Sequence, residues 1–390
     1  MRIIVDENIP GVEHFLTVQE SVHYLPGRSI SADDVATADA LLVRSVTPVN
    51  AALLKNSTVR FVGSATAGTD HVDLQWLKKQ GIHFVYAPGC NAVAVAEYVL
   101  TAINAASVYY QYNWMHKTVG IIGHGHVGGY LHRILKSAGV ACIVYDPFAP
   151  ADDGSDVTLS ELLQSADVVT LHTPLTKTGS HPTWHMIGST ELNMMKPNAL
   201  LINTSRGAVT DNAALSAHLN THPRFTAVLD VWENEPTLNT TLLQQVFIAT
   251  GHIAGYTPES KLKSSKIVCD ALCDYLAISE PGRSPWHLPK TTICLKAIKK
   301  SINTVCFPQV LQQLFRQLYA IEQDSLHFKQ LISHAATTED VATTFDKYRR
   351  SYQKRREFFS AQSTKESVNL IRQKNPDLFT LLYNLGFHFL

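Results

Sequence analysis

The stretch that decides the fold is TVGIIGHGHVG, residues 118–128. Its first five residues form the kind of short apolar run that is typical of a buried strand, and an amphipathic helical pattern begins at His126. Glycines in the loop between them would allow a tight turn, a close approach of a pyrophosphate, and close packing of helix on strand. The N-terminus of the helix would offer free N–H groups to phosphates. Strand, loop and helix together predict a dinucleotide-binding unit whose contacts include Gly123, Gly125, His126, Val127 and Gly128.

An acidic residue follows at the end of the next predicted strand. Asp146 stands 18 residues after Gly128. A carboxylate in this place accepts hydrogen bonds from the adenosine ribose and repels a 2′-phosphate, so the sequence predicts NAD rather than NADP. The alternative is a glycine turn in an α/β domain that binds no nucleotide. The strand, the helix and the acid in register favour the cofactor.

Outward from this loop, short apolar runs alternate with helical patterns along most of the chain. This alternation predicts an α/β protein with two Rossmann-like, doubly wound parallel-sheet domains. A long helix is predicted over Ala92–Val108. The predicted strands are Arg2–Val5, Leu41–Val43, Val59–Val62, Ile82–Val85, Thr118–Ile122, Ala141–Tyr145, Val168–Leu171, Leu200–Asn203, Ala227–Leu229 and Phe247–Ala249.

The character of the chain changes after the Pro- and Gly-containing segment Pro281–Pro285. Beyond it, apolar residues at helical spacing indicate a C-terminal α+β domain, which we expect to serve dimerisation. A second apolar stripe supports that expectation, at Val310, Leu311, Leu314 and Leu318. The predicted division is a substrate-binding domain over 1–93 plus 257–280, an NAD-binding domain over 94–254, and a dimerisation domain over 286–390.

Three polar residues follow predicted strands of the nucleotide-binding domain. Arg206 comes after Leu200–Asn203, Glu235 after Ala227–Leu229, and His252 after Phe247–Ala249. The carboxyl ends of parallel strands face the ligand crevice. A cation for a carboxylate, a base for a hydroxyl proton and an acid that orients the base are what oxidation of a 2-hydroxy acid requires. Each residue alone is more often a solvated charge, and spacing does not separate Glu235 from Glu233.

Composition excludes several classes of partner. The 390 residues contain 33 basic and 33 acidic side chains, so there is no overall basic excess to attract nucleic acid or an anionic membrane. The six cysteines show neither Cys-x-x-Cys pairs nor zinc spacing, which fits reduced thiols and predicts no metal site. We see no signal peptide and no apolar run near the ~20 residues of a membrane span. We expect a soluble cytoplasmic protein.

The motifs together resemble the D-2-hydroxyacid dehydrogenase family. The resemblance rests on the glycine loop and on three further segments: Asn203–Gly207 (NTSRG), Asp230–Pro236 (DVWENEP) and Gly251–Gly255 (GHIAG). A narrower match inside the family is carried by Val43–Thr47, Gly63–His71 and Phe345–Phe358, and it implies a phosphorylated 2-hydroxy acid as substrate. His124 and His126 depart from the small or amide side chains that are usual in the loop.

The resemblance implies a role for individual residues. It makes Arg206, Glu235 and His252 catalytic, which favours Glu235 over Glu233. It also implies a homodimer with a contact in the helix at Ala92–Val108. The substrate would contact Ser45, Thr66 and Tyr256. Apart from the resemblance, a substrate phosphate needs hydrogen-bond donors, and Arg44, Ser45 and the Ser64–Gly68 loop are candidates, since a glycine-containing loop can present N–H groups to an anion. NAD would contact Asp146, Thr173, Thr204, Ser205, Asp230 and Gly255.

Two alternatives stay open from the sequence. One is a different 2-hydroxy acid, of the 3-phosphoglycerate or glycerate type, and the other is a non-enzymatic NAD-sensing protein of the same fold. A basic helix is also predicted from Val341 to Phe358. Its arginines either form a solvated face with ion pairs at helical spacing, or one of them, Arg349, binds the substrate phosphate.

Overall fold

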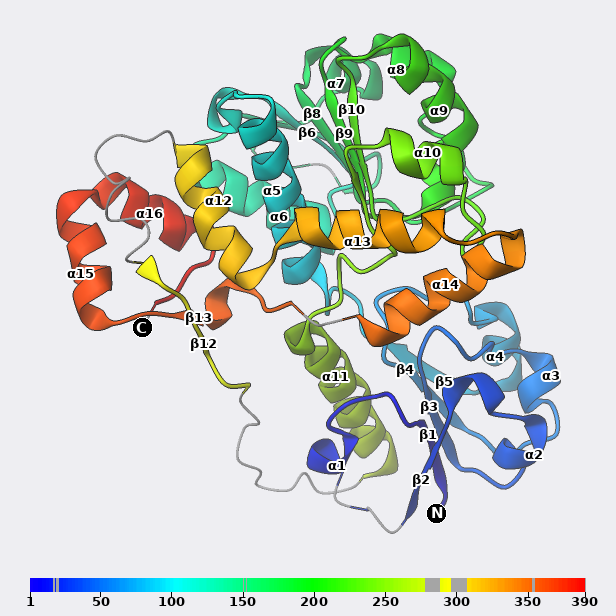
Figure 1. The fold of residues 1–390 in the computed structure, drawn as a ribbon. Helices are drawn as coiled ribbons and strands as arrows, with labels where there is room; N and C mark the ends of the chain where they lie inside the picture. The colour runs from blue at the N-terminus through cyan, green and yellow to red at the C-terminus, as the bar shows by residue number, and fades with distance from the viewer. Residues whose placement is uncertain are drawn as a thin grey trace. The chain divides into compact units, whose positions relative to one another are not determined.

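The structure is a computed structural model of the full chain. It describes all residues except 17, 19, 20, 150, 152, 278–287, 296–306, 353, 354 and 390. The segment Pro281–Pro285, the domain boundary at 286, Cys306 and Lys354 therefore lie outside the described residues. Two compact units emerge, one formed by residues 1–91 and 256–288 and the other by 92–255 and 289–390. Figure 1 shows the elements of both.

The first unit is built on a five-stranded parallel sheet in the order β2-β1-β3-β4-β5. Apolar clusters cover both faces of this sheet, one under α2, α3 and α4 and the other under α1 and α11. The doubly wound arrangement follows from strands that are apolar on both sides. The elements are β1 Ile3–Asp6, α1 Val12–Phe15, β2 Val22–Leu25, α2 Ala32–Val35, β3 Ala40–Val43, α3 Ala51–Leu54, β4 Phe61–Ser64, α4 Leu74–Gln80, β5 His83–Tyr86 and α11 Pro258–Leu276.

The second unit contains a six-stranded parallel sheet in the order β11-β10-β9-β8-β6-β7. The chain passes from β6 outward to β7 and then returns to β8 on the other side of β6. The crevice at this switch point, outside the carboxyl ends of the strands, is where such sheets bind ligands. The elements are β6 Val119–Ile122, α6 His126–Ser137, β7 Cys142–Tyr145, α7 Leu159–Ser165, β8 Val168–Leu171, α8 Ser189–Met194, β9 Leu200–Asn203, α9 Asn212–Thr221, β10 Thr226–Leu229, α10 Thr240–Gln245 and β11 Ile248–Ala249.

The C-terminal elements pack within this second unit. Helix α12 lies against the long helix α5, and α13 lies against the edge strand β11 (Figure 1). The four apolar side chains of α12 that we expected at a dimer contact are buried inside the unit, so that expectation was wrong for them. The elements are α5 Ala92–Tyr109, β12 Thr291–Thr292, α12 Phe307–Leu318, α13 Ile321–Ser333, α14 Thr338–Ser351, β13 Ala361–Gln362, α15 Lys365–Lys374 and α16 Pro376–Asn384.

Helix α5 is the one described helix that is long and apolar enough to cross a membrane by length and composition. The sequence predicted this helix, but the statement that no apolar run approaches the length of a membrane span did not take its 18 residues into account. In the structure 83% of its 18-residue window is buried inside the protein. This is the environment of a core helix, and it explains the apolar composition without a bilayer.

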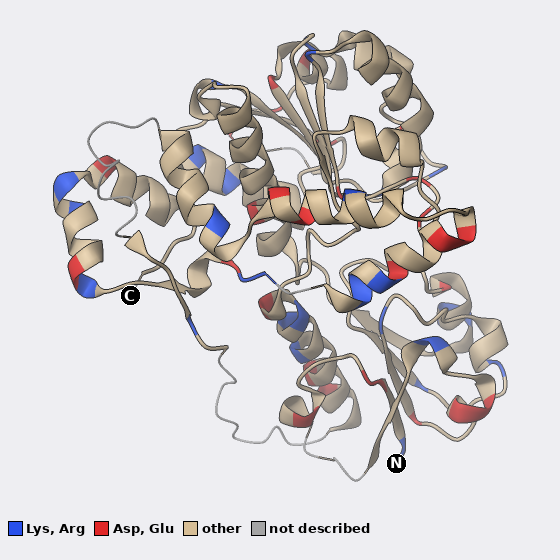
Figure 2. Cartoon of the chain, in the orientation of Figure 1, with Lys and Arg blue, Asp and Glu red and all other residues tan. Residues whose placement is uncertain are grey.

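The predicted strands are present, and three elements differ from the prediction: two strands and one helix. Strand β2 was missed because it is a half-exposed edge strand, with His23 and Tyr24 open to solvent. Strand β4 begins two residues later than predicted and includes Gly63 and Ser64. The basic helix ends at Ser351, so the later arginines do not lie on it. Acidic residues occupy the first turn of α14 and basic residues its last (Figure 2), which suits the helix dipole.

Candidate active site

The glycine loop joins β6 to α6 and leaves an open cradle. Gly123 has φ +92°, and a Cβ there would lie 2.7 Å from the carbonyl oxygen of His172. A Cβ on Gly128 would lie 1.9 Å from the carbonyl oxygen of Gly123, so helix and strand touch at this point. Gly125 is different, because a Cβ there would meet no protein atom within 4 Å. It is also the N-cap of α6 without a side-chain cap, so the first N–H groups of the helix remain available to an anion.

Two hydroxyl groups that follow neighbouring strands of this sheet lack hydrogen-bond partners among the described residues. Thr173 follows β8 and Thr204 follows β9, and the side-chain oxygen of each is buried and unpaired among the described residues. The methyl carbon of Thr173 would be 3.0 Å from a Cβ on Gly123. Buried polar atoms are normally paired in proteins, so unpaired ones at a crevice indicate a missing ligand. The cradle and both hydroxyls fit a dinucleotide.

Asp146 directly follows β7 and is bonded to the glycine loop. One carboxylate oxygen accepts a hydrogen bond of 2.7 Å from the backbone N–H of His124, and the other accepts from the N–H groups of Phe148 and Ala149. The ring of His124 is bonded to the ring of His132 on α6 at 3.1 Å. The loop therefore accommodates this histidine by directing its ring toward α6.

Glu235 and His252 form a hydrogen-bonded pair. Nδ1 of His252 lies 2.8 Å from Oε2 of Glu235, and the other glutamate oxygen accepts a 2.8 Å bond from the backbone N–H of Trp232. Burial opposes ionisation of Glu235. Nevertheless its pKa is lowered, because His252, the Trp232 N–H and the cation of Arg349 all favour the carboxylate. The arrangement is an ionised carboxylate that orients an imidazole.

The segment that carries Arg206 lies beside the turn that carries Glu235. A Cβ on Gly207 would be 1.9 Å from the carbonyl carbon of Trp232, so only glycine permits this approach. Ser205 is held by Asn203, whose side-chain oxygen accepts from both the N–H and the hydroxyl of the serine. The guanidinium of Arg206 donates to the Ser205 carbonyl at 2.8 Å.

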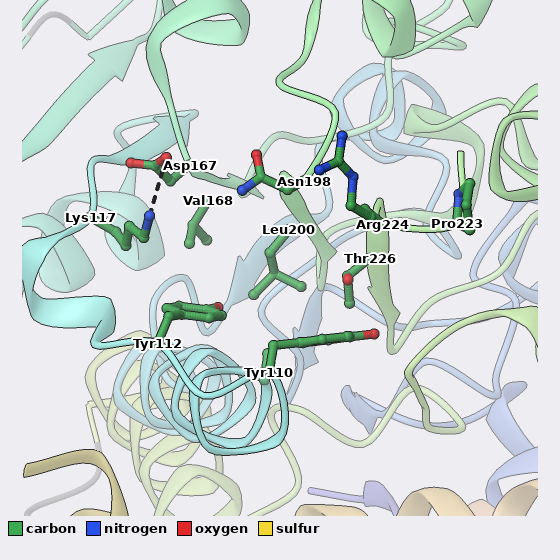
Figure 3. Close-up of a pocket in the computed structure, with 11 residues that line it drawn as sticks. Tyr110, Tyr112, Lys117, Asp167, Val168, Asn198, Leu200, Pro223, Arg224 and Thr226 are labelled. Atoms are coloured by element: carbon green, nitrogen blue, oxygen red, sulfur yellow. Dashed lines mark ion pairs between the residues drawn. The ribbon is translucent and has the colours of Figure 1, made fainter. Parts of the chain in front are cut away.

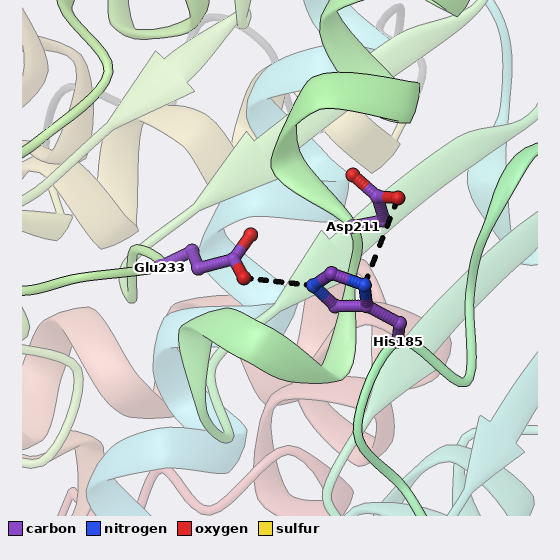
Figure 4. A group of neighbouring side chains, drawn as sticks. All are labelled: His185, Asp211 and Glu233. Atoms are coloured by element: carbon purple, nitrogen blue, oxygen red, sulfur yellow. Dashed lines mark hydrogen bonds and ion pairs between the residues drawn. The ribbon is translucent and has the colours of Figure 1, made fainter.

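The neighbouring glutamate, Glu233, has a different partner. Its Oε1 lies 2.7 Å from Nε2 of His185, and Nδ1 of the same ring lies 3.7 Å from Asp211 (Figure 4). These three side chains could be mistaken for a metal site. The two carboxylates instead meet opposite edges of one imidazole, which already pairs them. This geometry separates the two glutamates where sequence spacing could not.

Asp230 lies behind the histidine loop, with 1% of its surface exposed. One oxygen accepts from the Thr250 hydroxyl at 2.6 Å and from the N–H of Ile253, and the other accepts from the N–H of Ala254. The side chain we predicted to contact NAD therefore also holds the loop of His252. Gly255 follows directly after this loop.

The first unit positions the remaining candidates after β3 and β4. Ser45 is exposed, and the Thr66 hydroxyl is bonded to Ser64 and to the Gly68 carbonyl. Arg44 is paired at 3.1 Å with Asp6, which is fully buried. Part of the Arg44 charge is thus used to compensate a buried carboxylate.

The sequence reading missed Lys261. Its ammonium group lies 4.1 Å from the ring centre of Tyr256, within the same unit. Pro258 starts helix α11 just after Tyr256, so a lysine in the first turn could have been placed near the tyrosine from sequence. It adds a cation next to a candidate substrate residue.

A described cavity of about 290 Å³ lies at the opposite end of the six-stranded sheet. Figure 3 shows Tyr110 and Tyr112 beside the starts of three strands, at Val168, Leu200 and Thr226. Arg206 and Glu235 follow the other ends of two of these strands, the ones that begin at Leu200 and Thr226. This cavity is therefore separate from the crevice that the glycine loop borders.

The fold, the open glycine cradle and the paired His252 and Glu235 define a dehydrogenase of 2-hydroxy acids. Residues 95–254 match the family described as D-isomer specific 2-hydroxyacid dehydrogenase, NAD binding domain. Residues 291–385 match a family described as a domain of unknown function. Solved structures with the same fold include NAD-bound 3-phosphoglycerate dehydrogenase of Entamoeba histolytica, with TM-score 0.61 and 24% identity, covering 74% of this chain and 99% of that one. D-2-hydroxyisocaproate dehydrogenase has TM-score 0.59 and 22% identity over 73% and 99%.

Two relatives match over nearly the whole chain. Erythronate-4-phosphate dehydrogenase of Cellvibrio japonicus is 41% identical, covering 93% of this chain and 94% of its own. The protein of that name from Proteus mirabilis is 39% identical over 100% and 99%. The chain belongs to the D-isomer specific 2-hydroxyacid dehydrogenase family. It is an NAD-dependent oxidoreductase, so the alternative of a non-enzymatic NAD sensor is not supported.

Proposed function

We propose that this protein oxidises 4-phospho-D-erythronate to (R)-3-hydroxy-2-oxo-4-phosphooxybutanoate in pyridoxal 5′-phosphate (vitamin B6) biosynthesis. The observation that carries the proposal is 41% identity over 93% of the chain with a protein named for this substrate. The pair of His252 and Glu235, which follow β11 and β10, supports it. NAD, when bound, supplies the hydride acceptor, and the chain's own residues bind, orient and deprotonate the substrate.

His252 is the proposed base. Its Nδ1 is occupied by Glu235, which leaves Nε2 for the substrate hydroxyl. Because Glu235 stays ionised, it fixes the tautomer and stabilises the imidazolium that forms when His252 takes the proton. Arg206 is the proposed ligand of the substrate carboxylate, which a guanidinium binds in fixed geometry.

The cofactor residues that we propose are those of the cradle and its neighbours. Gly125 and the free N–H groups of α6 suit a pyrophosphate, and Thr173 and Thr204 offer unpaired hydroxyls. Asp146 is the proposed partner of the ribose. The proposed set also includes Gly123, His126, Val127, Gly128, Ser205, Asp230 and Gly255.

Substrate binding is proposed for Ser45, Thr66 and Tyr256 from the family resemblance. Arg44 is the weaker candidate for phosphate because Asp6 already uses part of its charge. Lys261 beside Tyr256 is a further cation of that unit.

Arg349 is the proposed phosphate ligand from the C-terminal segment. It lies on α14 close enough to Glu235 to lower the pKa of that carboxylate, which supports a place near the catalytic pair. Arg349→Ala should raise KM for the phosphorylated acid roughly tenfold or more, the worth of one charge-assisted bond, without changing NADH affinity. Arg350→Ala, on the exposed side of the same helix, is the matched control. Equal KM values for the two variants would return α14 to a structural role.

A homodimer in the cytoplasm is proposed as the working form. Tyr109 and Tyr110 at the end of α5 are 68% and 47% exposed, and their rings contact Phe247. Such an aromatic patch suits a protein contact. Light scattering measures the molar mass of the wild type and of a Tyr109→Ser/Tyr110→Ser variant. We expect a dimer for the wild type and a monomer for the variant, and a monomeric wild type would contradict the proposal.

The test of substrate is a panel of acids with NAD at alkaline pH, which favours oxidation because a proton is released. We compare 4-phosphoerythronate with 3-phosphoglycerate, glycerate and D-lactate by NADH formation. The proposal expects the highest kcat/KM for 4-phosphoerythronate. A higher value for 3-phosphoglycerate or glycerate would establish the alternative that the sequence left open.

A further inference from the structure

Most backbone N–H groups of the segment 250–254, which carries His252, are hydrogen-bonded to other parts of the protein. The N–H groups of Thr250 and His252 donate to the carbonyls of Leu229 and Asp230, at 3.0 and 2.6 Å. The next two N–H groups bond Asp230, and Trp232 donates its ring N–H to the Thr250 carbonyl at 2.8 Å. No ligand is needed to complete this loop.

His252 itself adopts a backbone conformation that side chains rarely choose, with φ +58°. Such a left-handed residue is strained and persists only where the surroundings over-determine it. The groups that hold the loop therefore also hold the imidazole in the place where it meets Glu235.

Several of these groups come from the C-terminal segment. The Ser325 hydroxyl accepts from the N–H of Ala249 at 2.9 Å, and Lys329 donates to the Val246 carbonyl at 2.5 Å. Ser325 and Lys329, both on α13, thus bond backbone groups at and just before the edge strand β11. A neighbouring strand would otherwise supply such bonds. A Cβ on Gly251 would lie 2.8 Å from the ring of Tyr348 and 3.0 Å from that of Phe328, so two aromatic rings close over the loop.

Arg355 completes the set at the far end of the loop. Its guanidinium donates to the carbonyl of Ala254 at 2.6 Å and also to the carbonyl of Ala94 in α5. The residue is 5% exposed, so the expectation of a solvated arginine was wrong. Glu97, at 3.8 Å, and the ring of Tyr319, at 4.4 Å, compensate the buried charge.

We propose that the C-terminal segment 307–358 is a positioning device for the catalytic histidine, with Arg355 as its principal positioning residue. The segment lies inside the stretch 291–385 that matches a domain of unknown function, and it covers about half of it. Arg355 fixes the Ala254 carbonyl to α5, while α13 and α14 hold the loop from the other end. The inference rests on the proposed role of His252 as base.

The test replaces Arg355 by methionine, which keeps the bulk and removes the guanidinium. Arg372→Met is the matched control, because Arg372 is an exposed arginine of α15 whose guanidinium faces a ring, that of Phe379. Hydrogen exchange of the peptide over 247–256 is measured by mass spectrometry, together with NADH affinity, kcat and the pH profile of kcat/KM. Exchange needs no substrate, so it decides the inference even if no acid of the panel is oxidised.

Arg355→Met should speed exchange of the loop roughly tenfold or more while the rest of the unit stays protected. It should lower kcat by about 10²-fold, as small misplacements of reacting groups do, and shift the pH profile. NADH affinity should stay within a factor of about three, since the cradle is untouched. The control should show none of these changes. Exchange and kcat equal to the control would overturn the inference.

A buried Glu97 without its arginine could prevent folding. The double variant Glu97→Gln/Arg355→Met removes that unpaired carboxylate and is judged by the same measurements. Failure of both variants to fold would also overturn the inference, because Arg355 would then determine the whole fold and not the loop.

Discussion

The glycine loop and the histidine loop both follow strands of the same sheet, yet they are completed in opposite ways. The glycine loop leaves space at Gly125 and N–H groups without a side-chain cap, and the unpaired hydroxyl of Thr173 lies near it. In the histidine loop, Gly251–Ala254, the protein bonds the N–H groups of the last three residues and the carbonyl of Ala254. A loop that binds a ligand leaves polar groups without protein partners, so that the ligand can bond them. A loop that positions a side chain has most of its polar groups bonded within the protein.

The largest effect is expected at the centre of the histidine loop. His252→Asn should lower turnover by about 10²–10⁴-fold, the usual worth of a positioned general base. NADH affinity and the melting temperature should hardly change, because asparagine tolerates the left-handed backbone. Steady-state kinetics and fluorescence titration with NADH measure both. Turnover near that of the wild type would remove His252 from the mechanism.

Alanine substitutions in the glycine loop separate ligand space from protein space. Gly125→Ala should weaken NADH binding by about tenfold or more with an unchanged melting temperature, because its Cβ meets no protein atom. Gly128→Ala should instead destabilise the fold by about 1–3 kcal/mol, because its Cβ collides with the Gly123 carbonyl. Calorimetry and titration of both variants decide. A destabilised Gly125→Ala protein would contradict the open cradle.

Asp146 gives a smaller, selective effect. Asp146→Asn keeps an oxygen for the His124 N–H but removes the charge that should repel a 2′-phosphate. The ratio of kcat/KM for NAD to that for NADP should fall by roughly tenfold. A wild type that already uses both cofactors equally would show that Asp146 does not select between them.

The smallest effect is the pH dependence of stability that we expect from Asp324 on α13, whose carboxylate is bonded to the Tyr352 hydroxyl. Burial raises the pKa of Asp324 to about 6 from its ordinary 3.8, although the Tyr352 hydroxyl bonded at 2.6 Å, Arg355 and His327 oppose the rise. The native state therefore holds this proton more tightly than the unfolded chain. Its stabilising contribution is complete below about pH 4 and is lost as pH rises through about 6.

Asp324→Asn cannot lose that proton. Its melting temperature should exceed that of the wild type by a few degrees at pH 8, and the difference should shrink toward pH 4.5. Thermal unfolding of both proteins across this range provides the measurement. A constant difference at every pH would show that Asp324 does not titrate in this window.

The sequence predicts the parts of the site that depend on local pattern. The glycine loop lies between strand and helix as its spacing indicates, and the trio follows strand ends because apolar runs reveal where parallel strands stop. Strand β2 shows the limit of this approach. An edge strand covered on one side needs no continuous apolar run, so Val22–Leu25 carries too little signal.

The partners of the histidine loop could not be predicted from sequence. Arg355 meets Ala94 across 261 positions of the chain and looked like one arginine of a solvated helix. Its burial depends on Glu97, Tyr319 and two carbonyls that come together only in the tertiary fold. Glu233 and Glu235 likewise differ only in which histidine each one reaches.

Helix α5 carries a consequence for the order of events during synthesis. The Asn104 side chain donates to the Pro308 carbonyl and to Gln312, and Glu97 accepts from the Phe358 N–H. These partners are translated 200 residues or more after the helix itself. Until these partners are synthesised, apolar surface of α5 and the carboxylate of Glu97, which is buried in the complete fold, stay exposed in the nascent chain. Exposed apolar surface of this kind favours chaperone binding and aggregation. We therefore expect this unit to complete its packing only after Pro308, Gln312 and Phe358 have been synthesised.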